Sequence, residues 1–344
     1  MLTEVALYLL KVLLVPALAG VVVGGVGVML VARRAEADRE QSVRRAQIGQ
    51  ALAAPIAFLA SFLMETGPVG LPPAERWHVL PYAVGVAAIV GAIVSSMRAA
   101  WWVQWLIVTV ILGALAWKFV VFPASNPYIQ VGLFGSIVLM GLLWSAVARD
   151  ACSVGVAMMA AIVFAGLGVL MILANFASLG VMVIAVAIAL GVLGMAIGVL
   201  NLREAARLRA AAPAQPVAVE QAPGGVTCPA EAACELVPWT AAAAATLAAI
   251  GCVLALCGHA YNYGEVRPMH WAVVLAAPFF ALLVCKPCLR GAKPIVGVAW
   301  RAGLCLVVVL AVVINAASQS GSDGGAAGGA ADSDPMADML GESK

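Results

Sequence analysis

Charged residues are scarce in this chain. Only 10% of its 344 residues are Asp, Glu, Lys or Arg, whereas 64% are hydrophobic. Soluble domains carry about 25% charged residues. A chain with this deficit has too few polar side chains to cover a water-exposed surface, so most of its side chains must face lipid or one another. The composition therefore excludes a soluble globular protein.

Carboxylates are absent from the centre of every long apolar stretch. Proton relays and ion pathways in membranes commonly use an intramembrane Asp or Glu. The sequence therefore disfavours an ion-driven pump. Two cations, Lys11 and Arg301, do lie within apolar stretches. Each is near the end of its stretch, so we expect its charged group to reach the membrane surface.

A basic segment in front of the first apolar stretch is also lacking. The chain starts with Met1–Glu4, and the first stretch runs directly into five arginines between residues 33 and 45. Secretory signal peptides have a basic n-region before their apolar core. We therefore expect the first stretch to be retained as a membrane span.

Long apolar runs are the most abundant feature of the chain. A helix of about 20 residues crosses a bilayer core of about 30 Å. The sequence therefore predicts an all-α, polytopic transmembrane helical bundle of about ten spans. The second, eighth and ninth are marginal, because they are short, rich in alanine or interrupted by proline. The predicted spans are 5–32, 48–64, 79–96, 99–117, 129–148, 154–174, 178–201, 237–257, 270–286 and 294–316.

The third and fourth runs are almost continuous. The residues between them, Ser95–Arg98, include no Gly or Pro to make a turn. A single helix over 79–117 would nevertheless be about 58 Å long at 1.5 Å per residue, almost twice the core thickness. We therefore predict a tight hairpin at this point.

The positions of Lys and Arg predict the orientation. If the residues after the first span are cytoplasmic, the inner segments hold 13 of the 19 cations and the outer segments hold four. Cytoplasmic loops carry the excess of Lys and Arg. Both ends of the chain are then outside (N-out/C-out). We expect a multi-pass protein of the cell (plasma) membrane, of the bacterial inner-membrane type.

Two segments divide the chain along its sequence. An Ala/Pro-rich cytoplasmic linker at 202–236 separates a seven-span block (1–201) from a three-span block (237–317), and an acidic tail at 318–344 follows. Linkers of this composition bury too little apolar surface to fold alone. We expect the tail, which is rich in Gly, Ala and Asp, to be disordered.

Four cysteines on the predicted inner side form the most specific motif. Cys285 and Cys288 make a C-x-P-C element at the end of a span, and Cys228 and Cys234 lie in the linker. Four thiolates would suit one zinc ion. Alternatively, the C-x-P-C pair would be redox-active, because a neighbouring Lys lowers a thiol pKa. Because the linker pair is spaced loosely for a zinc knuckle, we favour independent thiols.

The three histidines all fall on the predicted outer side, next to span ends. They are His78, His259 and His270. A metal or haem site, or a proton-sensitive patch, would use such an outer-face polar cluster. Three unrelated interfacial histidines are the interpretation that we favour.

The scarcity of intramembrane polar groups favours a binding or scaffold subunit of a membrane assembly. One alternative is an uncoupled small-molecule transporter or permease, whose midplane cavity would use Ser61, Gln104, Thr109 and Thr246. Another is a membrane thiol oxidoreductase that uses Cys285 and Cys288. We expect no catalytic residue and no cofactor. The expected partners are the lipid bilayer and other membrane subunits, and no nucleic acid.

Overall fold

A computed structural model describes residues 7–8, 10–33, 39–68, 76–119, 127–211, 237–260, 266–288 and 294–326. Ten α-helices lie in these ranges, and no β-strand does. A π-helical turn, η1 (Leu10–Leu14), precedes the first α-helix, and a 3₁₀ turn, η3 (Arg76–Val79), precedes α4. The α-helices are α2 (Val15–Arg33), α3 (Arg39–Thr66), α4 (Leu80–Ser96), α5 (Trp101–Phe119), α6 (Pro127–Asp150), α7 (Ser153–Leu173), α8 (Ala177–Ala211), α10 (Ala241–Ala260), α11 (Pro268–Cys288) and α12 (Pro294–Ala326).

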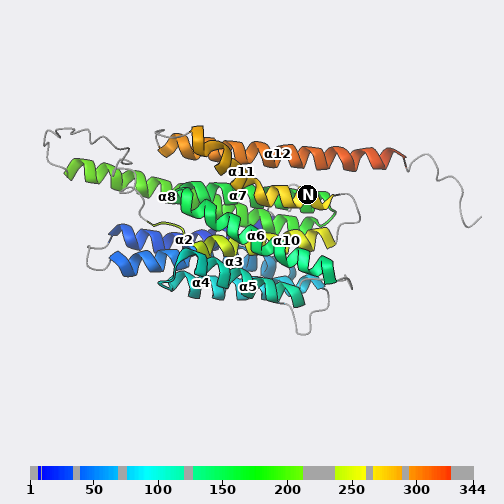
Figure 1. Cartoon of the computed structure of the whole chain (residues 1–344), viewed down its shortest axis with the longest axis horizontal. Helices are drawn as coiled ribbons and strands as arrows, with labels where there is room; N and C mark the ends of the chain where they lie inside the picture. The colour runs from blue at the N-terminus through cyan, green and yellow to red at the C-terminus, as the bar shows by residue number, and fades with distance from the viewer. Residues whose placement is uncertain are drawn as a thin grey trace, which may run out of the picture.

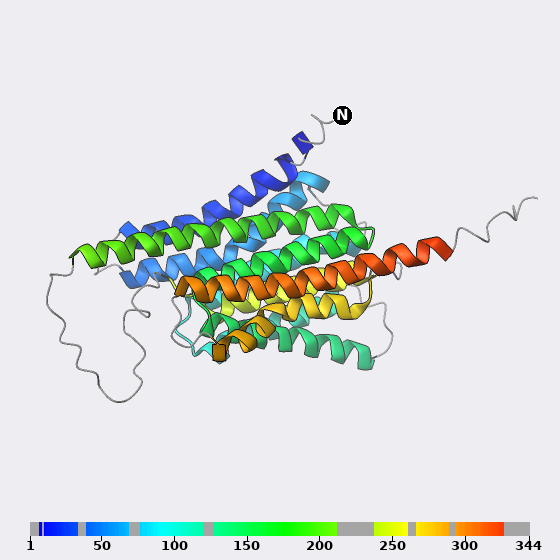
Figure 2. The ribbon, with the colours of Figure 1, turned by 90° about the horizontal axis from the view of Figure 1, so that it is seen from above.

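The helices run side by side along the long axis of the molecule (Figures 1 and 2). The first and last described helices, α2 and α12, have their chain-terminal ends at the same end of the bundle. This arrangement confirms the predicted all-α membrane bundle with about ten spans, and it agrees with two chain ends on one side. That this side is the outside is an inference from the cations alone. The end with residues 97–100 and 151–152 is called the inner end below.

Seven of the helices in the described ranges are long and apolar enough to cross a membrane. They include α3, α10 and α11, which correspond to the three marginal spans of the sequence. Two further described stretches, Leu10–Val26 and Trp101–Ile111, are apolar helices of shorter length. The chain is therefore an integral membrane protein, and its doubtful spans are helices like the others.

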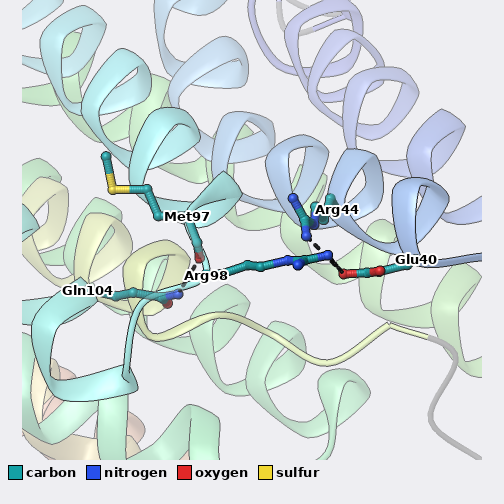
Figure 3. Close-up of polar contacts among 5 residues, drawn as sticks. All are labelled: Glu40, Arg44, Met97, Arg98 and Gln104. Atoms are coloured by element: carbon teal, nitrogen blue, oxygen red, sulfur yellow. Dashed lines mark hydrogen bonds and ion pairs between the residues drawn. The ribbon is translucent and has the colours of Figure 1, made fainter.

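The predicted hairpin between the third and fourth runs is present. Helix α4 ends at Ser96 and α5 begins at Trp101, while Met97 adopts an extended conformation with φ −77° and ψ 142°. The side-chain amide of Gln104 donates to the carbonyl oxygens of Met97 at 3.2 Å and Ala99 at 3.3 Å. Figure 3 shows the first of these bonds. A side chain one turn into α5 thus satisfies carbonyls of a turn that lacks glycine.

Three helices extend beyond their predicted spans. Helix α3 begins at Arg39, α8 continues to Ala211, and α12 continues to Ala326. Hydropathy marks where the apolar surface stops, but Ala, Arg, Gln and Glu continue α3 and α8 well, whereas the Ser- and Gly-rich end of α12 is helical against its propensity. The linker therefore starts with a helical extension of α8. Residues 318–326 of the predicted tail belong to α12, and the rest of 318–344 lies outside the described residues, so the disorder of the tail stays a prediction.

Helix α10 lies at the centre of the bundle. It packs against α3, α4, α5, α6, α7 and α11, so helices from both predicted blocks surround it (Figure 1). The linker at 202–236 therefore separates the two blocks along the sequence only, because helices of the two blocks pack against one another. Side chains along α10 are small, with five consecutive alanines at 241–245, and this lets the neighbouring helices approach closely.

Glycines allow close contact at other helix pairs. A Cβ atom on Gly20 of α2 would lie 2.6 Å from the carbonyl oxygen of Ala53 in α3. On Gly24, one turn later, it would lie 2.9 Å from Leu193 of α8. The small-x-x-x-small pattern of α2 therefore fits a helix between α3 and α8 inside one chain.

Candidate functional site

The start of α10 is held by polar side chains from four other helices. The carbonyl oxygen of Val237 accepts hydrogen bonds from Ser153 Oγ of α7 at 2.5 Å and from Gln50 Nε2 of α3 at 3.5 Å. Gln47 Nε2, one turn before Gln50, donates to the carbonyl of Pro238 at 3.4 Å. Residues 237–241 and these donors are called the α10 entry below.

Thr240 completes the α10 entry. Its Oγ1 accepts the backbone N–H of Ala243 at 3.0 Å, which is an N-terminal cap for α10, and it lies 3.0 Å from Ser95 Oγ of α4. Ser145 of α6 donates to the carbonyl of Ala241 at 3.2 Å. The first turn of a helix leaves backbone groups without intrahelical partners. Thr240 Oγ1 provides an acceptor for one of the unpaired N–H groups. The buried donors of Ser153, Gln50 and Ser145 bind carbonyls before and within the first turn, so the chain enters the bundle at a fixed position.

An ion-pair network lies at the same inner end (Figure 3). Glu40 Oε1 accepts from Arg44 Nη2 at 2.8 Å and from Arg98 Nη2 at 2.5 Å. Glu40 lies outside the apolar part of α3, which starts near Ile48. Hydrogen bonds first from Arg44 and then from Arg98 hold the pKa of the Glu40 carboxyl below its ordinary value. The network links the start of α3 to the α4–α5 hairpin.

Other arginines are exposed at this inner end. Arg149 places its guanidinium 5.4 Å from the ring centre of Trp101, a cation–π contact. Arg45, Arg203 and Arg207 are exposed on α3 and on the extension of α8. Arg301, in contrast, is half-buried and reaches the carbonyl of Asp150 at 3.5 Å. The described part of the inner end therefore presents a basic surface around the linker's attachment points.

The side chains expected to line a transport cavity are used within the bundle. Thr109 and Thr246 donate to carbonyls one turn earlier in their own helices, Trp105 at 2.6 Å and Ala242 at 2.8 Å. Gln104 serves the α4–α5 turn, as described above. Ser61 donates to the carbonyl of Val12 at 2.8 Å. Each of the four donors is therefore committed to the backbone.

One of the interior hydrogen bonds compensates a proline. Pro16 has no N–H, so the carbonyl of Val12, four residues earlier, loses its helical donor, and Ser61 replaces it. Trp144 Nε1 of α6 donates to the carbonyl of Leu275 at 3.0 Å and so joins α6 to α11. Neighbouring helices satisfy carbonyls freed by proline in membrane proteins. These polar side chains stabilise the bundle.

The three histidines have different surroundings. His78 stacks near Trp77, with ring centres 4.4 Å apart, in an aromatic group that also contains Phe62. His259 is exposed at the end of α10. His270 is buried, and its Nε2 lies 3.0 Å from Asn315 Oδ1 of α12. In the described part of the chain, no three His, Cys, Asp or Glu side chains are placed to share a metal ion.

The cysteine motif is only partly described. Cys285 is buried near the end of α11, and Cys288 is the last residue of that helix. Cys228 and Cys234 lie outside the described residues. A four-thiolate zinc site, a redox pair and independent thiols all stay predictions, of which we favour the third.

Sequence reasoning did not find the α10 entry. Gln50 lies near the start of the short second span, and Ser95, Ser145 and Ser153 lie near span ends, where polar residues are common. A local signal was nevertheless present, because Pro238 and Thr240 directly precede a run of alanines, and Thr is a favoured N-cap residue. The partners of the cap come from distant segments, which one sequence does not reveal.

Comparisons with known proteins give no homologue for the chain. No protein-family model matches it, and neither the curated proteins nor the solved structures include a significant match.

Proposed function

We propose that this integral membrane protein is a binding or scaffold subunit of a membrane assembly in the cell membrane. The α10 entry is the observation that carries the proposal. Helix α8 reaches Ala211 and the chain re-enters the bundle at Val237, where Ser153 and Gln50 hold it. Both attachment points of the segment 212–236 are therefore fixed at the inner end.

The charge of the inner end supports a docking role. Arg45, Arg203 and Arg207 are exposed there, and the segment 212–236 adds Glu220, Glu231 and Glu235 but no Lys or Arg. The exposed arginines suit recognition of a partner with complementary charge, because such charges accelerate encounter and fix orientation.

The use of the interior polar groups favours this function over transport. A permease binds its substrate through polar groups at mid-depth. In this bundle the donors of Ser61, Thr109 and Thr246 contact backbone carbonyls. These side chains are used within the bundle backbone, as expected of a rigid anchoring subunit.

The test is isolation of the tagged full chain from its native membrane in a mild detergent, followed by native gel analysis. We expect a complex larger than the chain with its detergent. The triple variant Arg45→Gln, Arg203→Gln, Arg207→Gln should release the partner. Arg267→Gln, which changes an exposed arginine next to the outer end of α11, is the matched control and should not. Migration of the chain without a partner would contradict the proposal. Equilibration of a solute across liposomes that contain the purified chain would contradict it too.

A further inference from the structure

Lys11 is a charged side chain on the exposed surface of an apolar helix. It is the second residue of the apolar stretch Leu10–Val26, and its side chain is exposed. Among the described residues, no side chain forms an ion pair with Lys11. A charged side chain at membrane depth marks a candidate functional site, because it is costly there without a partner. We therefore expect the partner of Lys11 among the lipids that surround the helix.

Two hydrogen bonds hold the turn that contains Lys11 against the end of α3. Tyr8 Oη donates to Glu65 Oε2 at 2.7 Å, and Ser61 Oγ donates to the carbonyl oxygen of Val12 at 2.8 Å. Glu65 follows Ser61 by one helical turn, and Val12 follows Tyr8 by one turn. The two segments therefore lie side by side over this turn, and Lys11 lies between the two points of contact.

Glu65 supplies a carboxylate at the same end of the bundle. It is partly exposed, one residue before α3 ends at Thr66. Tyr8 donates to its Oε2, and no described residue donates to its Oε1 or forms an ion pair with it. Because Lys11 and Glu65 are not paired with each other, each can bind a group of opposite charge.

The two charged groups can reach the same depth. Lys11 lies three residues beyond Tyr8, or about 4.5 Å along a helix. A lysine side chain can extend its ammonium that far toward the membrane surface while its methylene groups stay in apolar surroundings. The Lys11 ammonium therefore reaches the level of the Glu65 carboxylate, which Tyr8 contacts.

An exposed apolar stripe continues from Lys11 along the helix. Leu14, Leu18 and Val22 follow it at the spacing of one helical face, and all three side chains are exposed. From Leu14 to Val22 the stripe measures about 12 Å at 1.5 Å per residue. One leaflet contributes roughly half of a core of about 30 Å. A phospholipid whose headgroup lies at Lys11 can therefore place an acyl chain along most of this leaflet.

We propose that Lys11 and Glu65 bind the headgroup of one phosphatidylethanolamine molecule in the outer leaflet. The phosphate would pair with the Lys11 ammonium, the ethanolamine ammonium would donate to Glu65, and one acyl chain would lie along the stripe on α2. Phosphatidylcholine has no N–H group to donate to Glu65, and phosphatidylglycerol has no cation. A headgroup with a phosphate and a protonated amine therefore fits this pair of residues. The proposal goes beyond the function proposed above and does not depend on it.

The test is native mass spectrometry of the full chain in detergent, titrated separately with phosphatidylethanolamine, phosphatidylcholine and phosphatidylglycerol of the same acyl composition. We expect one phosphatidylethanolamine per chain to bind at least about threefold more tightly than either of the other lipids, as one additional ion pair near a surface provides. Equal binding of the three lipids to the wild type, or tighter binding of phosphatidylglycerol, would overturn the proposal.

Single charge variants test the two residues. Glu65→Gln should reduce the binding of phosphatidylethanolamine to that of phosphatidylcholine, whereas Glu40→Gln, which changes an exposed carboxylate at the inner end, should leave the preference intact. Lys11→Gln should weaken the binding of all three lipids, whereas Arg267→Gln, at an exposed position near the outer end of α11, should not. Retention of the full preference in Glu65→Gln, or unchanged binding in Lys11→Gln, would also overturn the proposal. If a variant fails to fold, the comparison of the three lipids on the wild type decides the outcome.

Discussion

Helices α10 and α12 are both apolar enough to span a membrane, but they occupy opposite environments. The most apolar stretch of α10 is 94% buried in the bundle, and that of α12 is 11% buried. Helix α10 contacts six other helices, whereas α12 packs mainly on α7 and α11 at one edge (Figure 1). Apolar composition predicts that a helix lies in the membrane. Small side chains then allow other helices to pack closely around it, as they do around α10.

The comparison also separates two sources of stability. Lipid tails are as apolar as a protein interior, so burying α10 gains little from removing apolar surface from water once the helix is in the bilayer. Close packing and hydrogen bonds distinguish its site from that of α12. Substitutions that remove packing or hydrogen bonds should therefore affect α10 strongly and α12 weakly.

The largest difference should come from removal of a large side chain. Leu254 of α10 is fully buried and Leu310 of α12 is 47% exposed. We expect Leu254→Ala to lower the free energy of unfolding by about 2–3 kcal/mol, through lost contacts and an unfilled cavity. Leu310→Ala should change it by less than about 0.5 kcal/mol, as at other surface sites. Unfolding in mixed micelles would measure both, and equal losses would contradict the comparison.

Addition of a side chain should reveal the same contrast. A Cβ atom on Gly251 of α10 would lie 2.8 Å from Leu275 of α11, whereas one on Gly297 of α12 would meet nothing within 4 Å. We expect Gly251→Leu to cost about 1–2 kcal/mol by overpacking. Gly297→Leu should be neutral or slightly stabilising, because leucine favours the helix more than glycine does. Thermal unfolding followed by circular dichroism would show whether Gly251→Leu alone lowers the midpoint.

A hydroxyl group should matter at the α10 entry and not on α12. Thr240 Oγ1 caps α10 and contacts Ser95. Ser318 Oγ donates to the carbonyl of Asn315 on an exposed part of α12. Loss of a helix cap costs about 1 kcal/mol, so Thr240→Ala should destabilise the protein by about that amount, and Ser318→Ala should have no measurable effect.

Hydrogen exchange at Ala243 offers a second readout for the cap. In Thr240→Ala this amide should exchange faster than in the wild type, because its acceptor is gone. Unchanged protection would show that the cap adds nothing to the packing of α10.

The contrast between α10 and α12 also shows what the sequence reveals. Apolar length predicted both helices, and the length argument correctly predicted the hairpin after Ser96. The central position of α10 was not predictable, because alanine is nearly neutral in hydropathy, and its burial depends on partners distant in sequence. The extent of α8 was underestimated, because helix propensity continues where apolar character ends. The end of α12 was missed for another reason: it is rich in Ser and Gly, and it is helical against its propensity.

For the candidate site, individual side chains were easier to note than to interpret. Ser61 and Gln104 attracted attention as polar residues in apolar stretches, yet their acceptors are carbonyls of Val12 and Met97. Pro16 and the turn after Ser96 both leave backbone carbonyls without helical N–H donors. The sequence therefore predicts that these carbonyls require other donors. Which side chain donates the hydrogen bond depends on how the helices pack, and this is not predictable from one sequence.

The smallest effect should arise at the exposed Glu40 network, where solvent competes with both ion pairs. Because Arg44 and Arg98 lower the pKa of Glu40 in the folded state, the carboxylate stabilises the fold at pH values above its unfolded pKa of about 4.3. This contribution is lost as the pH falls through the lower, folded pKa. We therefore expect the wild type to melt slightly above Glu40→Gln from pH 6 to 8, and the difference to vanish once the pH has fallen below the folded pKa of Glu40. High salt at pH 7 should also reduce the difference in melting temperature, since exposed pairs are screened.

A difference that grows toward low pH would mean that the two arginines do not stabilise the ionised form, and that the α3 start is held to the α4–α5 hairpin by packing instead.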